Sequence, residues 1–521
     1  MDRRVSAETK VAWDSASPLH RFAVPLPPWG RRVTVIDWLA SRADRVIETS
    51  CAWVFLEQDR ALKVKKPVDF GFLDFSTLEK RRWALSRELS FNRTTAPDIY
   101  QALRRLTQQE GGGFAIDGVG DVVEYALEMR RFDPAAVLSE HPDDADGALA
   151  EALGRTIAQF HANADVRPEG GGVKALGFTI RTNADHLRAV ARELGAEAVE
   201  RVIAGTDTAF EAASPLLELR RRQGFARRCH GDLHLGNILL DNGRPVLFDC
   251  IEFNDLLSEI DVQYDVAFLV MDLWFRGRVE AANRALNAWL DEGARSLPPT
   301  LWDGLAALPL MLAARAAVRA HVTANQDDIE AARAYLAAAE AHLAAPRPRL
   351  VAIGGLSGSG KTTLARRLAP SLGGAPGAIV LRSDEIRKRL VGIAPLDRIP
   401  RRAYTRRKSA ETYGEMLRLA RRLLAAGQAV VMDAVYLGPE SRRAVERLAA
   451  DSGVPFHGVW LQGDPDRLRA RLAARTGDAS DADASVLAEQ LATDPGPMAW
   501  TVQGASDLDN PGERILAEIG H

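Results

Sequence analysis

Hydrophobic and polar positions follow two different spacings in the first part of the chain. Residues 53–56 and 61–64 are short apolar runs around a polar turn at 57–60, a pattern that predicts a β-hairpin. A helix is expected over about residues 75–92. Beyond about residue 151 the spacing is mostly helical, with a break at 228–255. These patterns predict one large unit that begins with a sheet and continues as helices.

The pattern changes after residue 350 to alternating strands and helices. This alternation favours a parallel α/β sheet. The Pro/Arg-rich segment around 346–349 disfavours helix and separates the two patterns. The expected strands are 350–354, 378–381, 429–432 and 456–461, and residues 361–368 are expected to be a helix. The predicted organisation is an extended lead-in at 1–30, one domain at 31–345, a linker at 346–349 and a second domain at 350–521.

Composition narrows the class of protein only slightly. Hydrophobic residues make up 46% and charged residues 26% of the 521 positions, with a formal net charge of -3. Such a balance is ordinary for a soluble protein and gives no whole-chain attraction to nucleic acid or membrane. The amino-terminal residues are polar, no apolar run reaches the length of a membrane span, and the three cysteines lie far apart. A cytoplasmic protein without a membrane partner is expected, and the oligomeric state stays open.

The clearest chemical motif of the second domain is the stretch from Gly355 to Thr362, which fits G-x-x-x-x-G-K-[ST]. Glycines let backbone N–H groups turn toward phosphates, the following helix directs its positive end at them, the lysine neutralises charge and the threonine can bind Mg²⁺. An apolar strand before the motif and an amphipathic helix after it support a P-loop. The predicted ATP-binding residues here are Gly355, Gly358, Ser359, Gly360, Lys361, Thr362 and Thr363.

Charged residues after the next strands complete the candidate site of the second domain. Asp384 follows the second strand and can accept the proton of an attacking hydroxyl group. Asp433 ends the third strand, where a carboxylate lies near the metal or the acceptor. Arginines such as Arg471 and Arg475 can stabilise the transferring phosphoryl group from a lid, although a solvated helix face is an equally good interpretation.

These motifs resemble those of small P-loop kinases, the branch with polynucleotide 5′-kinases, chloramphenicol-type phosphotransferases and zeta-toxin-like kinases. The likeness covers residues 348–521. It implies that Asp384 activates the acceptor hydroxyl and that Arg387 helps to hold the acceptor. Residues 382–408 contain ten Lys/Arg against three Asp/Glu, a local charge of +7. This segment could grip a nucleic-acid end or form an exposed helix face.

The first domain contains a second phosphoryl-transfer motif. His230, Asp232 and Asn237 reproduce the H-x-D-x-x-x-x-N spacing of a kinase catalytic loop. The aspartate can accept a hydroxyl proton and the asparagine can bind Mg²⁺. Asp249 ends a short strand at the place of a second metal-binding carboxylate.

This motif set resembles the aminoglycoside phosphotransferase branch of the protein-kinase-like fold, over about residues 35–340. The resemblance implies that Asp232 is the catalytic base and that Asn237 and Asp249 bind the metal. It implies a phosphate-contacting lysine at Lys63, with Lys65 as the alternative. Glu88 would pair with that lysine, and Met129 would lie at the adenine-binding hinge. No glycine-rich loop precedes Lys63; the turn at 57–60 stands there instead.

The sequence therefore predicts a fusion of a bilobal, α+β, protein-kinase-like domain with an α/β P-loop domain. Each is expected to transfer the γ-phosphoryl group of ATP, with Mg²⁺, to a hydroxyl group of a small molecule, or of a nucleic-acid 5′ end in the second domain. The alternative is that one domain is a nucleotide-binding or ATP-hydrolysing module that regulates the other.

Overall fold

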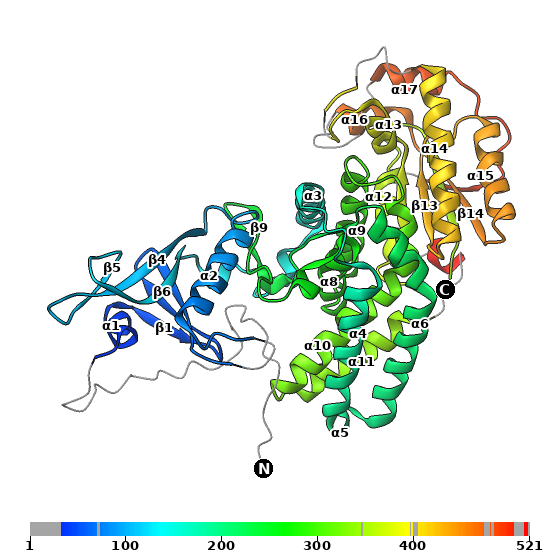
Figure 1. Cartoon of the computed structure of the whole chain (residues 1–521). Helices are drawn as coiled ribbons and strands as arrows, with labels where there is room; N and C mark the ends of the chain where they lie inside the picture. The colour runs from blue at the N-terminus through cyan, green and yellow to red at the C-terminus, as the bar shows by residue number, and fades with distance from the viewer. Residues whose placement is uncertain are drawn as a thin grey trace.

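The computed structural model describes residues 33–69, 73–344, 347–395, 397–399, 405–473, 480, 484–504 and 515–518. The expected lead-in at 1–30 lies outside the described residues. Figure 1 shows a sheet-rich lobe at one end, a helical lobe in the middle and a second α/β domain at the other end. The two predicted fold classes are thereby confirmed.

The amino-terminal lobe is a six-stranded antiparallel sheet in the order β1-β2-β3-β6-β4-β5. The predicted hairpin is present, with Val54 opposite Lys63. The predicted helix after it begins later than expected, because the Thr77 side chain accepts a hydrogen bond from Lys80 N–H and caps its start. The elements of this lobe are α1 Val35–Arg42, β1 Arg45–Glu48, β2 Ala52–Glu57, β3 Arg60–Lys65, α2 Leu78–Asn92, β4 Tyr100–Gln108, β5 Phe114–Ile116 and β6 Asp121–Arg130.

The middle lobe is helical and also contains two short two-stranded sheets, whose strands precede and follow the kinase-like motif in the chain. Its largest fully buried side chains include Trp289 of α9 and Phe268 of α8. Its helices are α3 Gly147–Asn163, α4 Gly172–Ala189, α5 Ala191–Leu194, α6 Ala196–Arg222, α7 Asp255–Ser258, α8 Val262–Phe275, α9 Val279–Gly293, α10 Leu308–Asn325 and α11 Ile329–His342. Its strands are β7 Ala226–Arg228, β8 Ile238–Asp241, β9 Arg244–Leu247 and β10 Glu259–Asp261.

One segment of this lobe, Leu301–Asn325, is long and apolar enough to cross a membrane by composition. Its most apolar window is 78% buried inside the protein, as in the core helix of a soluble protein. Arg315 within it is buried and hydrogen-bonded to backbone carbonyl groups. The three cysteines are free thiols.

The carboxy-terminal domain is a five-stranded parallel sheet in the order β12-β13-β11-β14-β15. Four of these strands and the helix after the glycine-rich motif match the sequence expectations; β15 is an additional strand. The strands are β11 Leu350–Gly355, β12 Ile379–Arg382, β13 Val430–Asp433, β14 Phe456–Gln462 and β15 Thr501–Gly504. The helices are α12 Lys361–Leu368, α13 Ser383–Val391, α14 Arg406–Ala425, α15 Pro439–Asp451, α16 Pro465–Ala473 and α17 Ala484–Leu491.

Helix α9 of the middle lobe lies along the edge strand β12 of the parallel sheet (Figure 1). Asn287 Oδ1 accepts a hydrogen bond from Val380 N–H at 2.7 Å, and Asn283 Nδ2 donates to the Ala378 carbonyl at 3.0 Å. Arg389 of α13 adds an ion pair with Asp291 at 2.6 Å. An edge strand exposes unpaired backbone groups, and here the first domain covers them.

Candidate active sites

The lysine and glutamate expected to pair in the amino-terminal lobe do so. Lys63 Nζ lies 2.6 Å from Glu88 Oε1 and 3.7 Å from Asp249 Oδ1. Burial favours the neutral form of Lys63, but the carboxylates of Glu88 and Asp249 outweigh it and raise its pKa above the ordinary value. Lys65 also contacts Glu88, at 2.7 Å, yet it is buried and turned to Glu252 at 3.3 Å. Of the two lysines, Lys63 thus lies nearer Asp249.

The residues of the kinase-like motif converge in the middle lobe. Asn237 Nδ2 donates hydrogen bonds to the backbone and side-chain oxygens of Asp232 at 2.8 and 3.0 Å. Asp265, which is fully buried, accepts hydrogen bonds from the backbone N–H groups of His230 and Gly231. A carboxylate that holds two successive N–H groups fixes the loop, so the orientation of Asp232 follows from the surrounding backbone.

Asp232 is ionised over a wide pH range. Burial alone would raise its pKa, but nearby His234, His230 and Arg319 outweigh burial and hold the pKa below its ordinary value. His234 Nε2 lies 3.6 Å from the Asp232 carboxylate, while its Nδ1 accepts a hydrogen bond from Gly236 N–H. The imidazole therefore directs its Nε2 edge at the carboxylate. The H-x-D-x-x-x-x-N spacing did not reveal this contact, because it assigns no role to residue 234.

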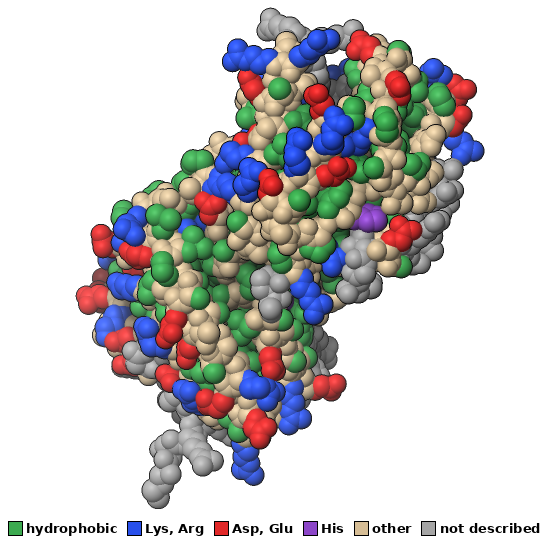
Figure 2. All heavy atoms as spheres, turned by 90° about the vertical axis from the view of Figure 1, so that its right-hand side faces the viewer, with side chains coloured by type: hydrophobic (Ala, Val, Ile, Leu, Met, Phe, Trp, Pro, Cys, Tyr) green, Lys and Arg blue, Asp and Glu red, His purple; other side chains and the backbone are tan. Residues whose placement is uncertain are grey.

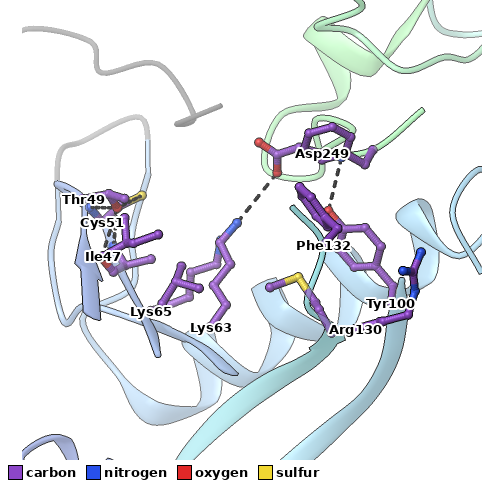
Figure 3. Close-up of a pocket in the computed structure, with 13 residues that line it drawn as sticks. Ile47, Thr49, Cys51, Lys63, Lys65, Tyr100, Arg130, Phe132 and Asp249 are labelled. Atoms are coloured by element: carbon purple, nitrogen blue, oxygen red, sulfur yellow. Dashed lines mark hydrogen bonds and ion pairs between the residues drawn. The ribbon is translucent and has the colours of Figure 1, made fainter. Parts of the chain in front are cut away.

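A cavity of about 730 Å³, part of it open to solvent, lies between the two lobes. Figure 3 shows Lys63 pointing across it to Asp249. Met129, the expected hinge residue, lines the same cavity. The other residues on its wall are Ile47, Thr49, Cys51, Ala52, Val54, Lys65, Tyr100, Arg130, Phe132 and Phe248. An apolar cleft with a lysine and a carboxylate at one end suits a nucleotide base and its phosphates.

The loop that borders this cavity is 49–51, between β1 and β2, whereas the turn at 57–60 does not line it. The loop at 49–51 contains no glycine. Thr49 Oγ1 accepts hydrogen bonds from the backbone N–H groups of Cys51 and Ala52 at 3.3 and 2.9 Å. The Thr49 side chain therefore stabilises the turn of this loop, and no glycine is needed for it.

Two side chains beside Asp232 fit a metal ion. Asn237 is fully buried, and its Oδ1 atom has no hydrogen-bond partner within the described part of the chain, while its Nδ2 is engaged by Asp232. Asp249 adopts φ +62°, a conformation uncommon outside glycine that is often retained at functional sites. Its N–H group is held by the Tyr100 hydroxyl at 3.2 Å (Figure 3). An oxygen pair of this kind suits Mg²⁺.

The glycine-rich motif of the second domain forms the loop between β11 and α12. Gly360 is the N-cap of α12 at φ +94°, where a side chain would be strained. Lys361 Nζ donates to the Leu356 carbonyl at 2.9 Å, and Gln490 of α17 accepts a hydrogen bond from Ser357 N–H. Gly355, Gly358 and Ser359 belong to this loop, and Thr363 to the first turn of α12.

Asp433 and Thr362 meet at the carboxyl edge of the parallel sheet. The Thr362 hydroxyl donates a hydrogen bond to Asp433 Oδ2 at 2.6 Å. This combination of a hydroxyl and a carboxylate, next to a phosphate-binding loop, fits a Mg²⁺ site. Asp384, at the start of α13, lies near the same carboxylate. Burial raises the pKa of Asp384, and Asp433 adds to the increase while Arg382 opposes it.

The expected acceptor-side arginines have different positions. Arg387 is buried on α13 and donates to Ser409 Oγ of α14 at 3.2 Å. Arg471 is exposed near the end of α16, and Arg475 lies outside the described residues. Ser480, from the same motif, donates a hydrogen bond to Asp384. The structure thus brings part of the expected lid to the candidate base.

The basic segment 382–408 is not a uniformly solvated patch. Arg382, Arg387 and Lys388 are buried. Arg407 and Lys408 both pair with Glu411 on their own helix. Part of the segment, including Arg401 and Arg402, lies outside the described residues. A count of charges could not anticipate that the chain folds several of them inward.

Comparison with known proteins agrees with these two sites. Residues 74–308 match the phosphotransferase enzyme family, and residues 350–495 match an AAA domain. An adenylyl-sulfate kinase of Myxococcus xanthus is 35% identical over 118 residues, which cover 22% of this chain and 59% of that protein. A solved choline/ethanolamine kinase family protein of Mesorhizobium loti covers 59% of this chain and 96% of its own, with 16% identity and a TM-score of 0.32. So low a TM-score carries no argument about function.

An uncharacterized protein of Mycobacterium tuberculosis is similar over nearly the whole chain. It is 31% identical over 493 residues, which cover 91% of this chain and 94% of the relative. The shared region includes both candidate sites. The chain therefore belongs to one family with this mycobacterial protein, and it is a kinase-type phosphotransferase in which a phosphotransferase-family domain precedes a P-loop kinase domain.

Proposed function

We propose that the chain is a bifunctional, cytoplasmic phosphotransferase in which each domain transfers the γ-phosphoryl group of Mg-ATP to a hydroxyl group. The observation that supports this proposal is that each domain has a carboxylate, proposed to act on the acceptor, close to a side chain proposed to bind the metal of Mg-ATP. These are Asp232 with Asn237, and Asp384 near Asp433. A domain that only bound nucleotide would not need the acceptor carboxylate.

In the amino-terminal site Lys63 is fixed by Glu88, and it can hold phosphate oxygens at the end of the apolar cavity. The Mg²⁺ that Asn237 and Asp249 would hold neutralises charge on the phosphates. Asp232 then accepts the proton of the acceptor hydroxyl as the hydroxyl oxygen attacks the γ-phosphorus, the bond from that phosphorus to the β–γ bridging oxygen breaks, and ADP leaves. The lowered pKa of Asp232 keeps it ionised for this step.

In the carboxy-terminal site the backbone N–H groups of the P-loop and Lys361 would hold the β- and γ-phosphates. Thr362 and Asp433 would hold Mg²⁺. Asp384 would accept the acceptor proton, and Arg387, one turn along α13, would orient the acceptor. Arg471 and Arg475 are proposed to stabilise the transferred group from the lid.

A small molecule is the proposed acceptor for both domains. For the carboxy-terminal domain the alternative is a nucleic-acid end, which requires a continuous exposed basic surface. Several basic side chains of 382–408 are instead buried or paired. On the face in Figure 2, Lys and Arg side chains are interspersed with Asp and Glu. This arrangement favours a small alcohol.

The test is transfer from γ-labelled ATP with the full-length chain. Sugars, amino alcohols, nucleosides, aminoglycosides and 5′-hydroxyl oligonucleotides would be offered to the wild type, Asp232→Asn and Lys361→Ala. Labelled products that disappear in one variant and persist in the other support two activities. If a single substitution removes all transfer, one domain regulates the other and the bifunctional proposal fails.

A further inference from the structure

Arg382 is the last residue of β12, and the sequence motifs assigned it no role. It is 5% exposed, and its guanidinium contacts Thr362, Asp433 and Glu385. Nη2 donates to Thr362 Oγ1 at 3.3 Å, and Nε lies 3.6 Å from Asp433 Oδ2. Nη1 donates to Glu385 Oε1 at 2.6 Å. Arginine stays charged even when buried, so this position receives a full positive charge.

The first two contacts involve the side chains that the proposed function assigns to Mg²⁺. The guanidinium and the metal would therefore interact with the same oxygen atoms, those of Thr362 and Asp433. Asp384 lies close enough to Asp433 for the two charges to repel each other. Two neighbouring carboxylates, the buried Asp433 and the half-buried Asp384, are costly without a nearby cation, and Arg382 supplies one.

The third contact gives the guanidinium a second partner. Glu385 lies one turn after Arg382 and holds it by a short ion pair. The Arg382 side chain can thus leave Asp433 and remain paired. Glu385 also lines an interdomain cavity with Asp291 and Asn287 of α9. Residues of the amino-terminal domain therefore line the same cavity as Glu385.

We propose that Arg382 is a positioning residue that neutralises Asp433 and holds Thr362 until Mg²⁺ enters, and then keeps its ion pair with Glu385. This role rests on the proposed function in one respect, the assignment of the metal to Thr362 and Asp433. In this role, the Arg382 guanidinium and Mg²⁺ compete for the Asp433 carboxylate. Removal of the guanidinium should make the site bind divalent metal more tightly and depend on it for stability.

The first test measures Mn²⁺ binding to the full-length protein without nucleotide, from the electron paramagnetic resonance signal of free Mn²⁺. All proteins carry Asp249→Asn, which silences the amino-terminal metal site. Arg382→Gln is expected to bind Mn²⁺ roughly tenfold more tightly than its parent. Arg382→Lys should stay near the parent value, because it keeps the charge. Asp433→Asn should lose the binding and so identify the site.

Arg389→Gln is the matched control. Arg389 lies on α13 and pairs with Asp291 across the domain interface, at 2.6 Å. Its removal takes away one partly buried arginine of this helix without changing the contacts of Thr362 or Asp433. Mn²⁺ affinity like that of the parent is expected for this variant. A comparable tightening in Arg389→Gln would indicate a general electrostatic effect and overturn the specific role of Arg382.

The second test compares thermal unfolding in EDTA and in excess Mg²⁺. The midpoint of Arg382→Gln should fall by about 2–4 °C in EDTA and recover with Mg²⁺. If Arg382 served only its ion pair with Glu385, the unfolding midpoint would fall and Mg²⁺ would not restore it. Unchanged or weaker Mn²⁺ binding, no Mn²⁺ binding by any of the proteins, or an unrestored midpoint overturns the inference. Tighter Mn²⁺ binding without transfer to any acceptor would refute the proposed function and leave the role of Arg382 standing.

Discussion

Asn287 of the kinase-like domain accepts a hydrogen bond from the backbone N–H group of Val380, at 2.7 Å, and so pairs with the edge strand of the P-loop sheet. Neighbouring Asn283 donates to the Ala378 carbonyl of the same strand. The two domains are thus joined through backbone groups as well as through exposed charges. Such contacts are specific, because each donor requires an acceptor at a defined position.

Asn287→Ala should destabilise the protein by about 1–3 kcal/mol, because Val380 N–H loses its partner at a packed interface. Urea unfolding of the full-length chain, monitored through its tryptophans, measures the change. Asn163→Ala is the control. Asn163 lies on the exposed side of α3, where its amide bonds only to its own helix. Equal stability of Asn287→Ala and the control would show that this bond does not contribute.

Asp232→Asn should reduce phosphoryl transfer by the amino-terminal domain by about 10²–10⁴-fold and leave ATP binding nearly unchanged. The carboxylate acts on the acceptor, while the nucleotide is expected to contact Lys63 and the apolar cavity. Turnover and the dissociation constant for an ATP analogue are measured separately. Asp165→Asn, at an exposed carboxylate, serves as the control. Unchanged turnover in Asp232→Asn would refute its assignment as the base.

Much of both sites could be predicted from local spacing. The Asp232–Asn237 contact and the P-loop follow from motifs whose members lie within one loop or one turn. Such arrangements depend on nearby backbone geometry, which the sequence specifies directly. The Lys63–Glu88 pair joins strand β3 to helix α2, and it was expected from the family resemblance. The loop that borders the nucleotide cavity, the β1–β2 connection, was not identified from the sequence, because it contains no glycine.

The remaining features depend on contacts between distant segments. Arg382 contacts Thr362 and Asp433, which lie on different elements, and no spacing relates them. Asn287 meets Val380 only after two domains pack together. The basic segment 382–408 looked like a surface patch because a charge count ignores burial. These features come from tertiary packing, which local patterns do not encode.

The chain should bind two nucleotides independently. The first cavity lies between the lobes of the kinase-like domain and the P-loop lies in the other domain, at separate places in Figure 1. Calorimetric titration with a non-hydrolysable ATP analogue should give two sites for the wild type and one each for Lys361→Ala and Lys63→Ala. If the wild type bound only one nucleotide and Lys361→Ala bound none, the prediction of two independent sites would be contradicted.

The two activities should differ in their response to acid. Burial raises the pKa of Asp384, whereas His234, His230 and Arg319 overcome burial and lower that of Asp232. A base is inactive when protonated, so transfer by the P-loop domain should fail first as pH decreases. The acid limb of kcat/KM for ATP reports the free enzyme. This acid limb is measured in Lys361→Ala for the first site and in Asp232→Asn for the second. If the two limbs coincided or came in the reverse order, the assignment of Asp232 and Asp384 as the bases would be contradicted.

Asp384→Asn and Arg387→Ala should separate acceptor chemistry from nucleotide binding in the P-loop domain. Both residues lie on α13, which follows the carboxyl end of β12 and lies outside the phosphate-binding loop, and Asp384 lies near Asp433. Ligands of open α/β sheets bind at this edge. Asp384→Asn should suppress transfer to the acceptor by about 10²–10⁴-fold while slow ATP hydrolysis persists.

Arg387→Ala should raise the KM for the acceptor more than the KM for ATP. Both variants are assayed in the Asp232→Asn background, so that only the P-loop domain transfers. Arg418→Ala on the exposed face of α14 is the control, because its ion pair with Glu415 lies within that helix. A small neutral acceptor should give rates that change little with salt, whereas an oligonucleotide end should bind with a steep salt dependence. If both variants instead lose ATP affinity equally, Asp384 and Arg387 serve the nucleotide, and the domain is a regulatory ATPase.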